Sequence, residues 1–251
     1  MLLLTAGLLT GCQSFSPERS IQAARQLAED HGFTRDRLDA GPFNPVVYHR
    51  GLHGQADRLV VYIEGDGRSF VTRRRVSANP TPAEPVALTM ALADPSPAVA
   101  YIARPCQFLL PLPAACQPKY WTSHRYAEIV IAAIDAALGN LKERSGVSNL
   151  GLVGYSGGGS VAALLAQRRR DIDWLVTVAA NLDHAAWTDW HGDTPLHGSL
   201  NPVERIDRLA DVPQLHIAGS EDKTVPPVLT QGFIQQLPDG TPVAFRLAAG
   251  I

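Results

Sequence analysis

Apolar positions along this chain fall into two alternating kinds of segment. Short apolar runs bounded by glycine, proline or polar residues are typical of buried strands, and alanine and leucine at three- or four-residue spacing are typical of packed helices. The expected strands are 46–48, 59–63, 99–102, 150–153, 174–179, 215–219 and 242–247. The expected helices fall within 14–39, 86–93, 126–141, 159–167, 202–209 and 227–237. This alternation predicts an α/β fold with a mostly parallel central sheet and helices on both faces.

The segment 149–167 changes from an apolar run to helical spacing across Gly154-Tyr155-Ser156-Gly157-Gly158. A G-x-S-x-G sequence between a strand and a helix is the pattern that exposes a serine on a sharp, strained turn. Glycines two positions away remove side chains that would collide there. The pattern predicts Ser156 as a nucleophile, with the N–H of Gly157 facing the site of a developing oxyanion. The alternative is a glycine-rich turn that only joins the two elements.

A second glycine-containing turn, Glu64-Gly65-Asp66-Gly67, directly follows an early predicted strand. Glycines let the backbone approach a substrate closely, so the N–H of Asp66 or of Gly67 is a candidate second oxyanion donor. A plain turn from strand to loop is the competing interpretation.

The sequence GSEDKTVPP at 219–227 places acids between a late predicted strand and a helix that begins with proline. A carboxylate at this point can orient a catalytic histidine. Asp222 is the better candidate and Glu221 is the fallback. Capping of the following helix is the structural alternative for Asp222, and Thr224 could serve as the cap instead.

From Val46 to the C-terminus, GYSGG, EGDG and GSEDKTVPP together resemble the α/β-hydrolase superfamily of the esterase and lipase type. The resemblance implies that Ser156 and Asp222 are catalytic, that Gly157 with Asp66 or Gly67 forms the oxyanion hole, and that a histidine follows the last strand. None of the 8 histidines lies beyond His216. We therefore expect that the final C-terminal segment, with the general base, is missing from this sequence rather than that the enzyme has lost it.

The function that the resemblance implies is a serine hydrolase that acts on a carboxylic ester or related small acyl substrate through an acyl-enzyme at Ser156. Two alternatives stay open. One is a lipid-anchored pseudoenzyme that binds its ligand without turnover. The other recruits His184, His191 or His197 as the base, from an irregular, cap-like insertion near 181–201.

Composition narrows the class of protein further. A chain of 251 residues with 45% apolar content is expected to form one domain with one large core. Its formal charge of −2 and the lack of a long basic run do not indicate a surface that binds nucleic acid. The arginine triplets 73–75 and 168–170 are expected to be solvated surface. No cysteine and histidine pairs stand at zinc-ligand spacing, so we expect neither a metal nor a cofactor. The oligomeric state cannot be derived from the sequence.

The first ten residues form an apolar segment that is too short to span a bilayer. The sequence Leu9-Thr10-Gly11-Cys12 at its end resembles the lipobox of bacterial lipoproteins. Unlike a typical lipoprotein signal, this one has no Lys or Arg before the apolar segment. The resemblance implies a signal peptide over 1–11, lipid attachment at Cys12, a tether and helix over 12–40 and the hydrolase domain over 41–251. Gln13 after the cysteine favours the outer membrane. The expected location is therefore the periplasmic side of the bacterial cell envelope.

Cys106 and Cys116 share one proline-rich segment. An oxidising periplasm would allow them to form a disulfide, whereas two free thiols are the alternative.

Overall fold

The computed structural model describes residues 15–54 and 56–249, and the proposed lipid attachment site at Cys12 lies outside these residues. The strands are β1 (Thr34–Arg37), β2 (Val46–Arg50), β3 (Arg58–Ile63), β4 (Phe70–Thr72), β5 (Arg75–Val76), β6 (Val99–Ile102), β7 (Asn149–Tyr155), β8 (Ile172–Val178), β9 (Gln214–Gly219) and β10 (Val243–Ala248). The helices are α1 (Pro17–Asp30), α2 (Val86–Ala93), α3 (Glu128–Ser145), α4 (Gly157–Ala166), α5 (His184–His191) and α6 (Pro227–Ile234), with 3-10 helices η1 (Pro118–Trp121) and η2 (Pro202–Leu209).

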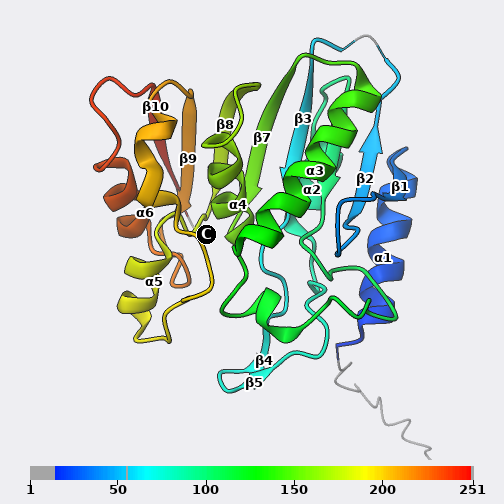
Figure 1. Cartoon of the computed structure of the whole chain (residues 1–251), viewed down its shortest axis with the longest axis horizontal. Helices are drawn as coiled ribbons and strands as arrows, with labels where there is room; N and C mark the ends of the chain where they lie inside the picture. Colours follow the sequence, from blue (N-terminus) through cyan, green and yellow to red (C-terminus); the bar gives the residue numbers. More distant parts are fainter. Residues whose placement is uncertain (1–14, 55, 250–251) are drawn as a thin grey trace, which may run out of the picture.

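The central sheet has eight strands in the order β1-β2-β6-β3-β7-β8-β9-β10 (Figure 1). All pairs from β6 to β10 are parallel, while β1 and β2 are antiparallel to their neighbours. The expected mostly parallel α/β sheet is therefore confirmed. Parallel pairing places the carboxyl ends of β3, β7 and β9 at one edge, where the loops that follow these strands can meet.

Helices pack on both faces because the buried strands alternate the direction of their apolar side chains. One face packs against α1 and α2, and its strand residues include Val46, Tyr48, Val99 and Tyr101. The other face packs against α3, α4 and α6, and its strand residues include Val47, Leu59, Val61 and Ile63. Figure 1 shows α3 running across the front of the sheet. The strand that leads to Ser156 is thus buried in the middle of the molecule.

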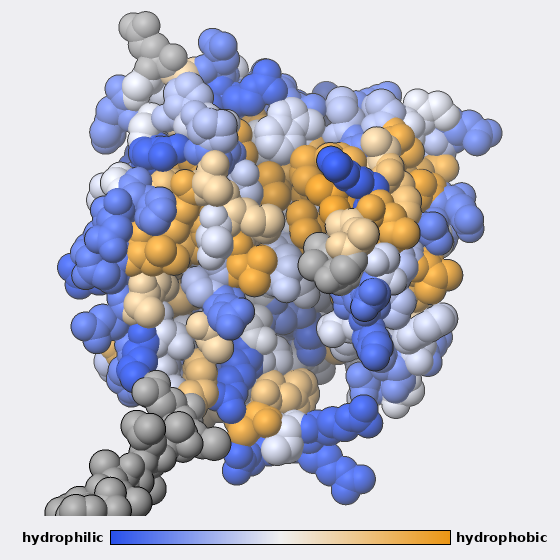
Figure 2. Space-filling view, turned by 180° about the vertical axis from the view of Figure 1, so that it is seen from behind, coloured by the Kyte–Doolittle hydropathy of each residue, from blue (hydrophilic) through white to orange (hydrophobic). Residues whose placement is uncertain are grey.

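The face that carries α1 and α2 is not covered evenly. Over β8, β9 and β10 the half-buried side chains of Trp174, Val176, Leu215 and Val243 line a shallow groove of about 410 Å³. Figure 2 shows apolar surface on this side of the molecule. None of the helices in the described ranges is both long and apolar enough to cross a bilayer.

Two strand regions were not expected from the sequence. The polar strand β1 lacks an apolar pattern, and it is stabilised by pairing with β2 and by Asp36, which accepts hydrogen bonds from His49 at 2.8 Å and Arg144 at 2.9 Å. The hairpin of β4 and β5 has no glycine or asparagine at its turn, so the usual hairpin signal is missing.

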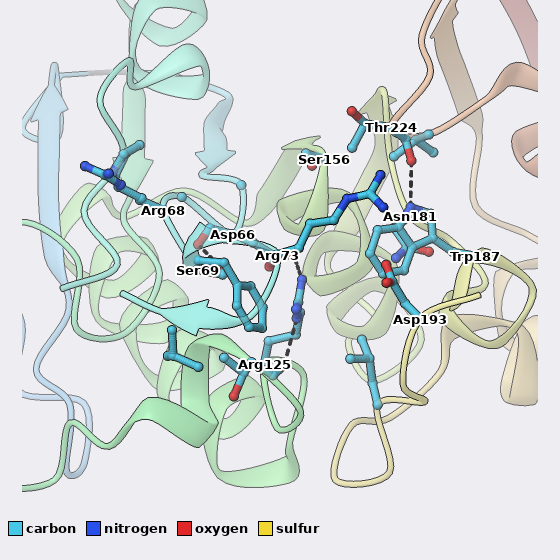
Figure 3. A pocket seen from close by; sticks show the side chains of 18 of the residues that line it. Asp66, Arg68, Ser69, Arg73, Arg125, Ser156, Asn181, Trp187, Asp193 and Thr224 are labelled. Carbon is cyan, nitrogen blue, oxygen red and sulfur yellow. Dashed lines mark hydrogen bonds and ion pairs between the residues drawn. The ribbon is translucent and has the colours of Figure 1, made fainter. Parts of the chain in front are cut away.

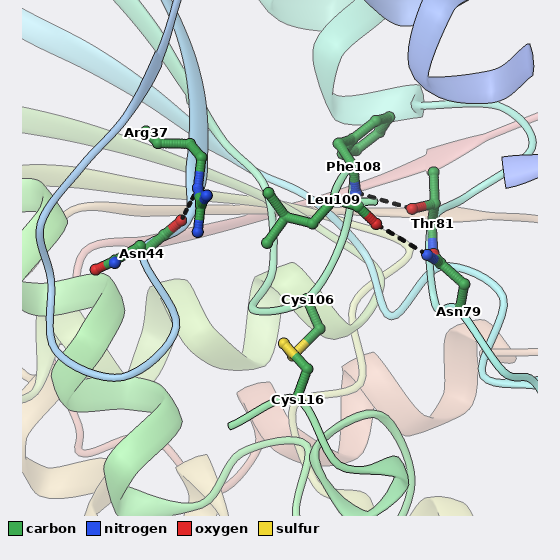
Figure 4. Close-up of a disulfide and its surroundings, with 8 residues drawn as sticks. All are labelled: Arg37, Asn44, Asn79, Thr81, Cys106, Phe108, Leu109 and Cys116. Atoms are coloured by element: carbon green, nitrogen blue, oxygen red, sulfur yellow. Dashed lines mark hydrogen bonds between the residues drawn. A yellow bond between two sulfur atoms is a disulfide. The ribbon is translucent and has the colours of Figure 1, made fainter. Parts of the chain in front are cut away.

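The segment 104–116 after β6 contains the disulfide between Cys106 and Cys116, which confirms the predicted pairing (Figure 4). Cys106 and Phe108 adopt positive φ angles of 72° and 56°. Hydrogen bonds support this conformation, because Phe108 N donates to Thr81 Oγ1 at 2.8 Å and Asn79 Nδ2 donates to the Leu109 carbonyl at 3.1 Å. The segment is therefore fixed both covalently and by buried polar contacts.

Replacing both cysteines by alanine should lower the free energy of unfolding by about 2–3 kcal/mol, because a closed loop of this length restricts the unfolded chain. Urea unfolding followed by circular dichroism measures the change. The unsubstituted protein in excess dithiothreitol should match the double variant. An unfolding midpoint insensitive to both treatments would contradict the prediction.

Candidate active site

Ser156 lies on a sharp turn between β7 and α4, with φ 50° and ψ −124°. The turn leaves no room for side chains on its glycines. A Cβ on Gly154 would lie 2.5 Å from the Gly158 carbonyl oxygen, and one on Gly158 would lie 2.2 Å from the Ile63 carbonyl oxygen. Real Cβ atoms do not approach so closely, so both positions require glycine. The strand, strained turn and helix that the G-x-S-x-G sequence predicted are all present.

Ser156 opens onto a large cavity at the carboxyl edge of the sheet (Figure 3). The cavity has a volume of about 1240 Å³. Its walls are the loop after β3, the β4–β5 hairpin, residues 122–125, the insertion after β8 and the loop after β9. In the described residues, no group of three or more His, Cys, Asp or Glu side chains is arranged to hold a metal ion.

The loop 64–67 packs directly on the serine turn. A Cβ on Gly65 would lie 3.3 Å from the Cβ of Ser156, and one on Gly67 would lie 2.1 Å from the Pro80 carbonyl oxygen. Gly67 also has a positive φ of 64°. This close approach brings the two segments that were predicted to donate to an oxyanion next to each other beside Ser156.

Unpaired backbone donors surround the serine. Within the described residues, the N–H groups of Gly157, Asp66 and Gly67 donate to no acceptor, whereas the next N–H, that of Arg68, donates to the Pro80 carbonyl at 3.0 Å. The Ser156 hydroxyl also has no hydrogen bond to another described residue. Buried backbone N–H groups are normally satisfied, so unpaired ones at a cavity are available for a ligand oxygen.

The carboxylate of Asp66 lies at the centre of a buried ion cluster that the sequence analysis did not anticipate. Its Oδ1 accepts from Arg104 at 2.9 Å, and its Oδ2 accepts from Arg125 at 2.7 Å and from the Tyr126 hydroxyl at 3.1 Å. Arg104 also donates to the Arg125 carbonyl. Burial alone would raise the pKa of Asp66, but the two arginines outweigh it and hold the pKa below its usual value.

This cluster sets the charge beside the predicted oxyanion site. A Cβ on Gly157 would lie 2.2 Å from Asp66 Oδ1, so the carboxylate packs against the first residue of α4. One carboxylate beside the proposed oxyanion site would repel a second negative charge. Two guanidinium groups outnumber this one carboxylate, so the cluster as a whole is positively charged. It therefore favours an anion at the proposed site. No sequence motif marks Arg104 or Arg125, since only tertiary packing brings them together.

Asp222 lies in the loop after β9, at the same edge of the sheet as Ser156. Its Oδ1 accepts from the backbone N–H groups of Thr224 at 2.7 Å and Val225 at 2.9 Å. Asp222 therefore caps its own turn, while α6 begins at Pro227 without a side-chain cap. The part of the chain that the structure describes places no histidine in hydrogen-bond contact with this carboxylate.

The three histidines of the insertion lie in different surroundings. His191 lines the cavity and donates from Nε2 to the Thr224 carbonyl at 2.9 Å. His184 is buried beside Tyr126, and burial lowers its pKa. His197 is exposed in a loop. Only His191 shares the cavity wall with Ser156, and no hydrogen bond joins them.

The insertion itself is more regular than expected, because residues 184–191 form the helix α5. Asp183 caps this helix by accepting from Ala185 N at 3.1 Å and Ala186 N at 3.2 Å, and Gly192 ends it with a φ of 62°. The capping aspartate and terminal glycine are the signals that could have predicted it.

Glu64 is a second buried acid beside the site. It is 1% exposed, and it accepts from Gly65 N at 2.9 Å and from the Tyr101 hydroxyl at 3.1 Å. Burial raises the pKa of Glu64 to about 7, although these hydrogen bonds partly oppose the shift. Glu64 thus changes charge near neutral pH at the start of the loop 64–67.

Substituting Asp66 by asparagine should lower the free energy of unfolding by about 3 kcal/mol, because Arg104 and Arg125 would be left buried without a counter-charge. Urea unfolding at pH 7 measures the loss. Asp193→Asn is the matched control, since Asp193 also lines the cavity but is exposed. Equal stability of the two variants would refute the structural role of the cluster.

Substituting Glu64 by glutamine should remove a pH dependence of stability. The folded-state pKa of about 7 lies above the unfolded value of 4.5, so the contribution of Glu64 is complete below pH 4.5 and is lost as the pH rises through 7. The difference in unfolding free energy between variant and unsubstituted protein should change by on the order of 2–3 kcal/mol over this window. Unfolding series at pH 5 and pH 8 test this, and parallel profiles would disprove it.

Comparison with known proteins gave no matching family model and no matching curated protein. Many solved structures match. Acylaminoacyl peptidase from Pyrococcus horikoshii superposes with a TM-score of 0.62 at 12% identity, over 86% of this chain and 36% of the peptidase. A puromycin-hydrolyzing peptidase from Mycobacterium tuberculosis gives 0.60 at 17% identity, again over 36% of that protein and 87% of this chain.

Smaller enzymes match along most of their own length. Est1E from Butyrivibrio proteoclasticus has a TM-score of 0.59 at 14% identity, with 87% of this chain and 88% of Est1E covered. The Pyrococcus furiosus esterase Pf2001 has a TM-score of 0.57 at 14% identity, with 88% of this chain and 82% of the esterase covered. The chain thus spans about a third of the peptidases and most of the esterases. At these identities the comparison establishes architecture, and the chain has the α/β-hydrolase fold.

Proposed function

We propose that this protein is a serine hydrolase that acts on a carboxylic ester or related acyl substrate through a covalent acyl-enzyme at Ser156. One observation carries the proposal. An unengaged serine hydroxyl on a strained turn faces a cavity, and the unpaired N–H groups of Gly157, Asp66 and Gly67 lie in the two segments that pack together beside it. This arrangement of a nucleophile and two donor segments is the one that acyl transfer requires.

The reaction would proceed in two halves. A histidine base takes the proton of Ser156 as its oxygen attacks the substrate carbonyl carbon, and the carbonyl oxygen becomes an oxyanion that accepts hydrogen bonds from the backbone donors. The histidine then returns the proton to the leaving alcohol as the carbon–oxygen bond breaks. Water, activated by the same base, attacks the acyl-enzyme and releases the acid.

Asp222 is proposed to orient that histidine. Only one of its oxygens is engaged by the backbone of its turn, so the second oxygen can accept from an imidazole. The end of β10 lies beside this turn, because Ser220 N donates to the Ala248 carbonyl at 2.8 Å. A histidine in the loop after β10, where the family resemblance implies it, would therefore emerge close to the carboxylate.

The preference for acyl substrates agrees with the similar structures, which include esterases and peptidases. The choice of an ester rests on the resemblance of the motifs. We also propose lipid attachment at Cys12 and a location in the bacterial cell envelope, both from the lipobox-like sequence.

A second candidate is a lipid-anchored protein that binds an acyl ligand without turnover. It is favoured by the surroundings of Ser156 and Asp222, neither of which contacts a histidine within the described residues. Under this alternative the cavity and backbone donors would hold a carbonyl or carboxylate oxygen without a subsequent attack.

A fluorophosphonate probe should label Ser156 if the serine is activated. Ser156→Ala should abolish labelling and lower ester turnover by about four to six orders of magnitude. Ser123→Ala is the matched control, since Ser123 is another serine of the cavity wall. Mass spectrometry of the labelled peptide identifies the modified residue.

Further variants identify the base. Loss of labelling in His191→Ala would assign this role to His191. Labelling that requires the reading frame to continue past Ile251 would assign it to a histidine encoded downstream. Absence of labelling in both the 251-residue chain and the extended chain would reject the hydrolase in favour of the binding protein.

A further inference from the structure

We infer that the β4–β5 hairpin is a docking surface for an anionic lipid membrane, at the mouth of the cavity. The turn of this hairpin consists of Arg73 and Arg74, and Arg75 begins β5. All three are exposed. Figure 1 shows the hairpin projecting from the body of the molecule. The hairpin therefore carries three adjacent positive charges, of which Arg73 also lines the cavity and reaches across it in Figure 3, whereas Arg74 and Arg75 lie outside the cavity wall.

These arginines lack partners of their own. In the described part of the chain, no ion pair or hydrogen bond involves the side chains of Arg73, Arg74 or Arg75. The other arginine triplet behaves differently. Arg168 pairs with Glu128 at 2.6 Å, and Arg169 pairs with Asp135 at 2.6 Å. Carboxylates of the same chain therefore pair with two of the three arginines of the second triplet, whereas within the described residues the hairpin triplet has no ion pair at all.

Apolar side chains accompany the charges. Phe70 and Val76 are paired directly across the hairpin, and they are 42% and 39% exposed. Both also line the cavity. Aromatic and aliphatic side chains next to clustered arginines are the combination that binds a membrane interface, where the apolar groups enter the acyl boundary and the cations contact phosphates.

The start of the described chain lies at the same place. The guanidinium of Arg68 stacks over the ring of Phe15 at 4.2 Å, and Phe15 lines the cavity together with Phe70. Figure 1 shows α1 beginning toward the same end of the molecule as the hairpin. A lipid on the proposed attachment site Cys12, shortly before Phe15, would hold this end against a bilayer. The hairpin and that tether would then engage one surface.

A membrane explains both features of the hairpin, whereas a soluble anion explains only one. Free phosphate would neutralise the arginines but would leave Phe70 and Val76 in water. The formal charge of the whole chain is −2, so attraction to anionic lipid must come from a local cluster rather than from the net charge. Docking through this hairpin would turn the mouth of the cavity toward the bilayer.

Vesicle sedimentation tests the inference with the full chain carrying Cys12→Ser, which prevents lipid attachment at that position. The protein should bind phosphatidylglycerol-containing vesicles and bind pure phosphatidylcholine vesicles much more weakly. The triple variant Arg73→Gln, Arg74→Gln and Arg75→Gln should bind the anionic vesicles on the order of 100-fold more weakly. The double variant Phe70→Ser and Val76→Ser should also bind more weakly.

The matched control is Arg205→Gln, Arg208→Gln and Arg246→Gln, which removes three exposed arginines outside the cavity wall and should leave binding nearly unchanged. Equal effects of the two arginine triples, or no preference for anionic vesicles, would overturn the inference. So would competition by inorganic phosphate combined with unchanged binding of the Phe70 and Val76 variant, which would indicate a soluble anion.

The readout is independent of the proposed chemistry. Ser156 labelling by the fluorophosphonate probe in solution should be the same in the Cys12→Ser parent and in a double variant Arg74→Gln and Arg75→Gln, which changes only the hairpin arginines that lie outside the cavity wall. Loss of membrane binding with retained labelling supports the inference, and failure of labelling in both proteins bears only on the hydrolase proposal.

Discussion

The close packing of the serine turn against the loop after β3 is the constraint on which the site depends. Gly158 meets the backbone of Ile63, Gly65 meets Ser156, and Gly157 meets the carboxylate of Asp66. Any side chain at these glycines would separate the two segments. Their separation would move the N–H groups of the two segments apart, so the geometry of the candidate site follows from a backbone contact between parts of the chain about ninety residues apart.

Two further structures keep that contact in place. The ion cluster of Asp66, Arg104 and Arg125 holds the loop 64–67 in position. If the Asp66 carboxylate rotated away from the two guanidinium groups, buried charges would be left unpaired. The disulfide-closed segment supplies Arg104 and also Gln107, whose Nε2 donates to the Gly65 carbonyl at 3.0 Å. The disulfide far from Ser156 in the sequence thus contributes to the rigidity of the loop beside it.

The charged side chains around the cavity are of two kinds, buried groups beside Ser156 and exposed arginines on the β4–β5 hairpin. Beside Ser156, the carboxylate of Asp66 is paired with two buried arginines, and Glu64 is uncharged below neutral pH. At the mouth of the cavity, the arginines of the β4–β5 hairpin face solvent next to apolar side chains. The buried charges position backbone groups for a small ligand, while the exposed charges suit an extended anionic surface.

The sequence alone predicted most of the strands and helices in their order, the serine turn and, with free thiols as the alternative, the disulfide, because each depends on local signals: apolar periodicity, glycine spacing and two cysteines in one short segment. It gave no indication of β1, whose polar residues are stabilised by His49 and Arg144, or of the β4–β5 hairpin, whose turn lacks glycine. The tertiary structure alone decided which arginines hold Asp66, which histidine of the insertion reaches the cavity and which arginine triplet stays unpaired. These features depend on residues that are distant in sequence and meet only when the sheet assembles, so no local pattern records them.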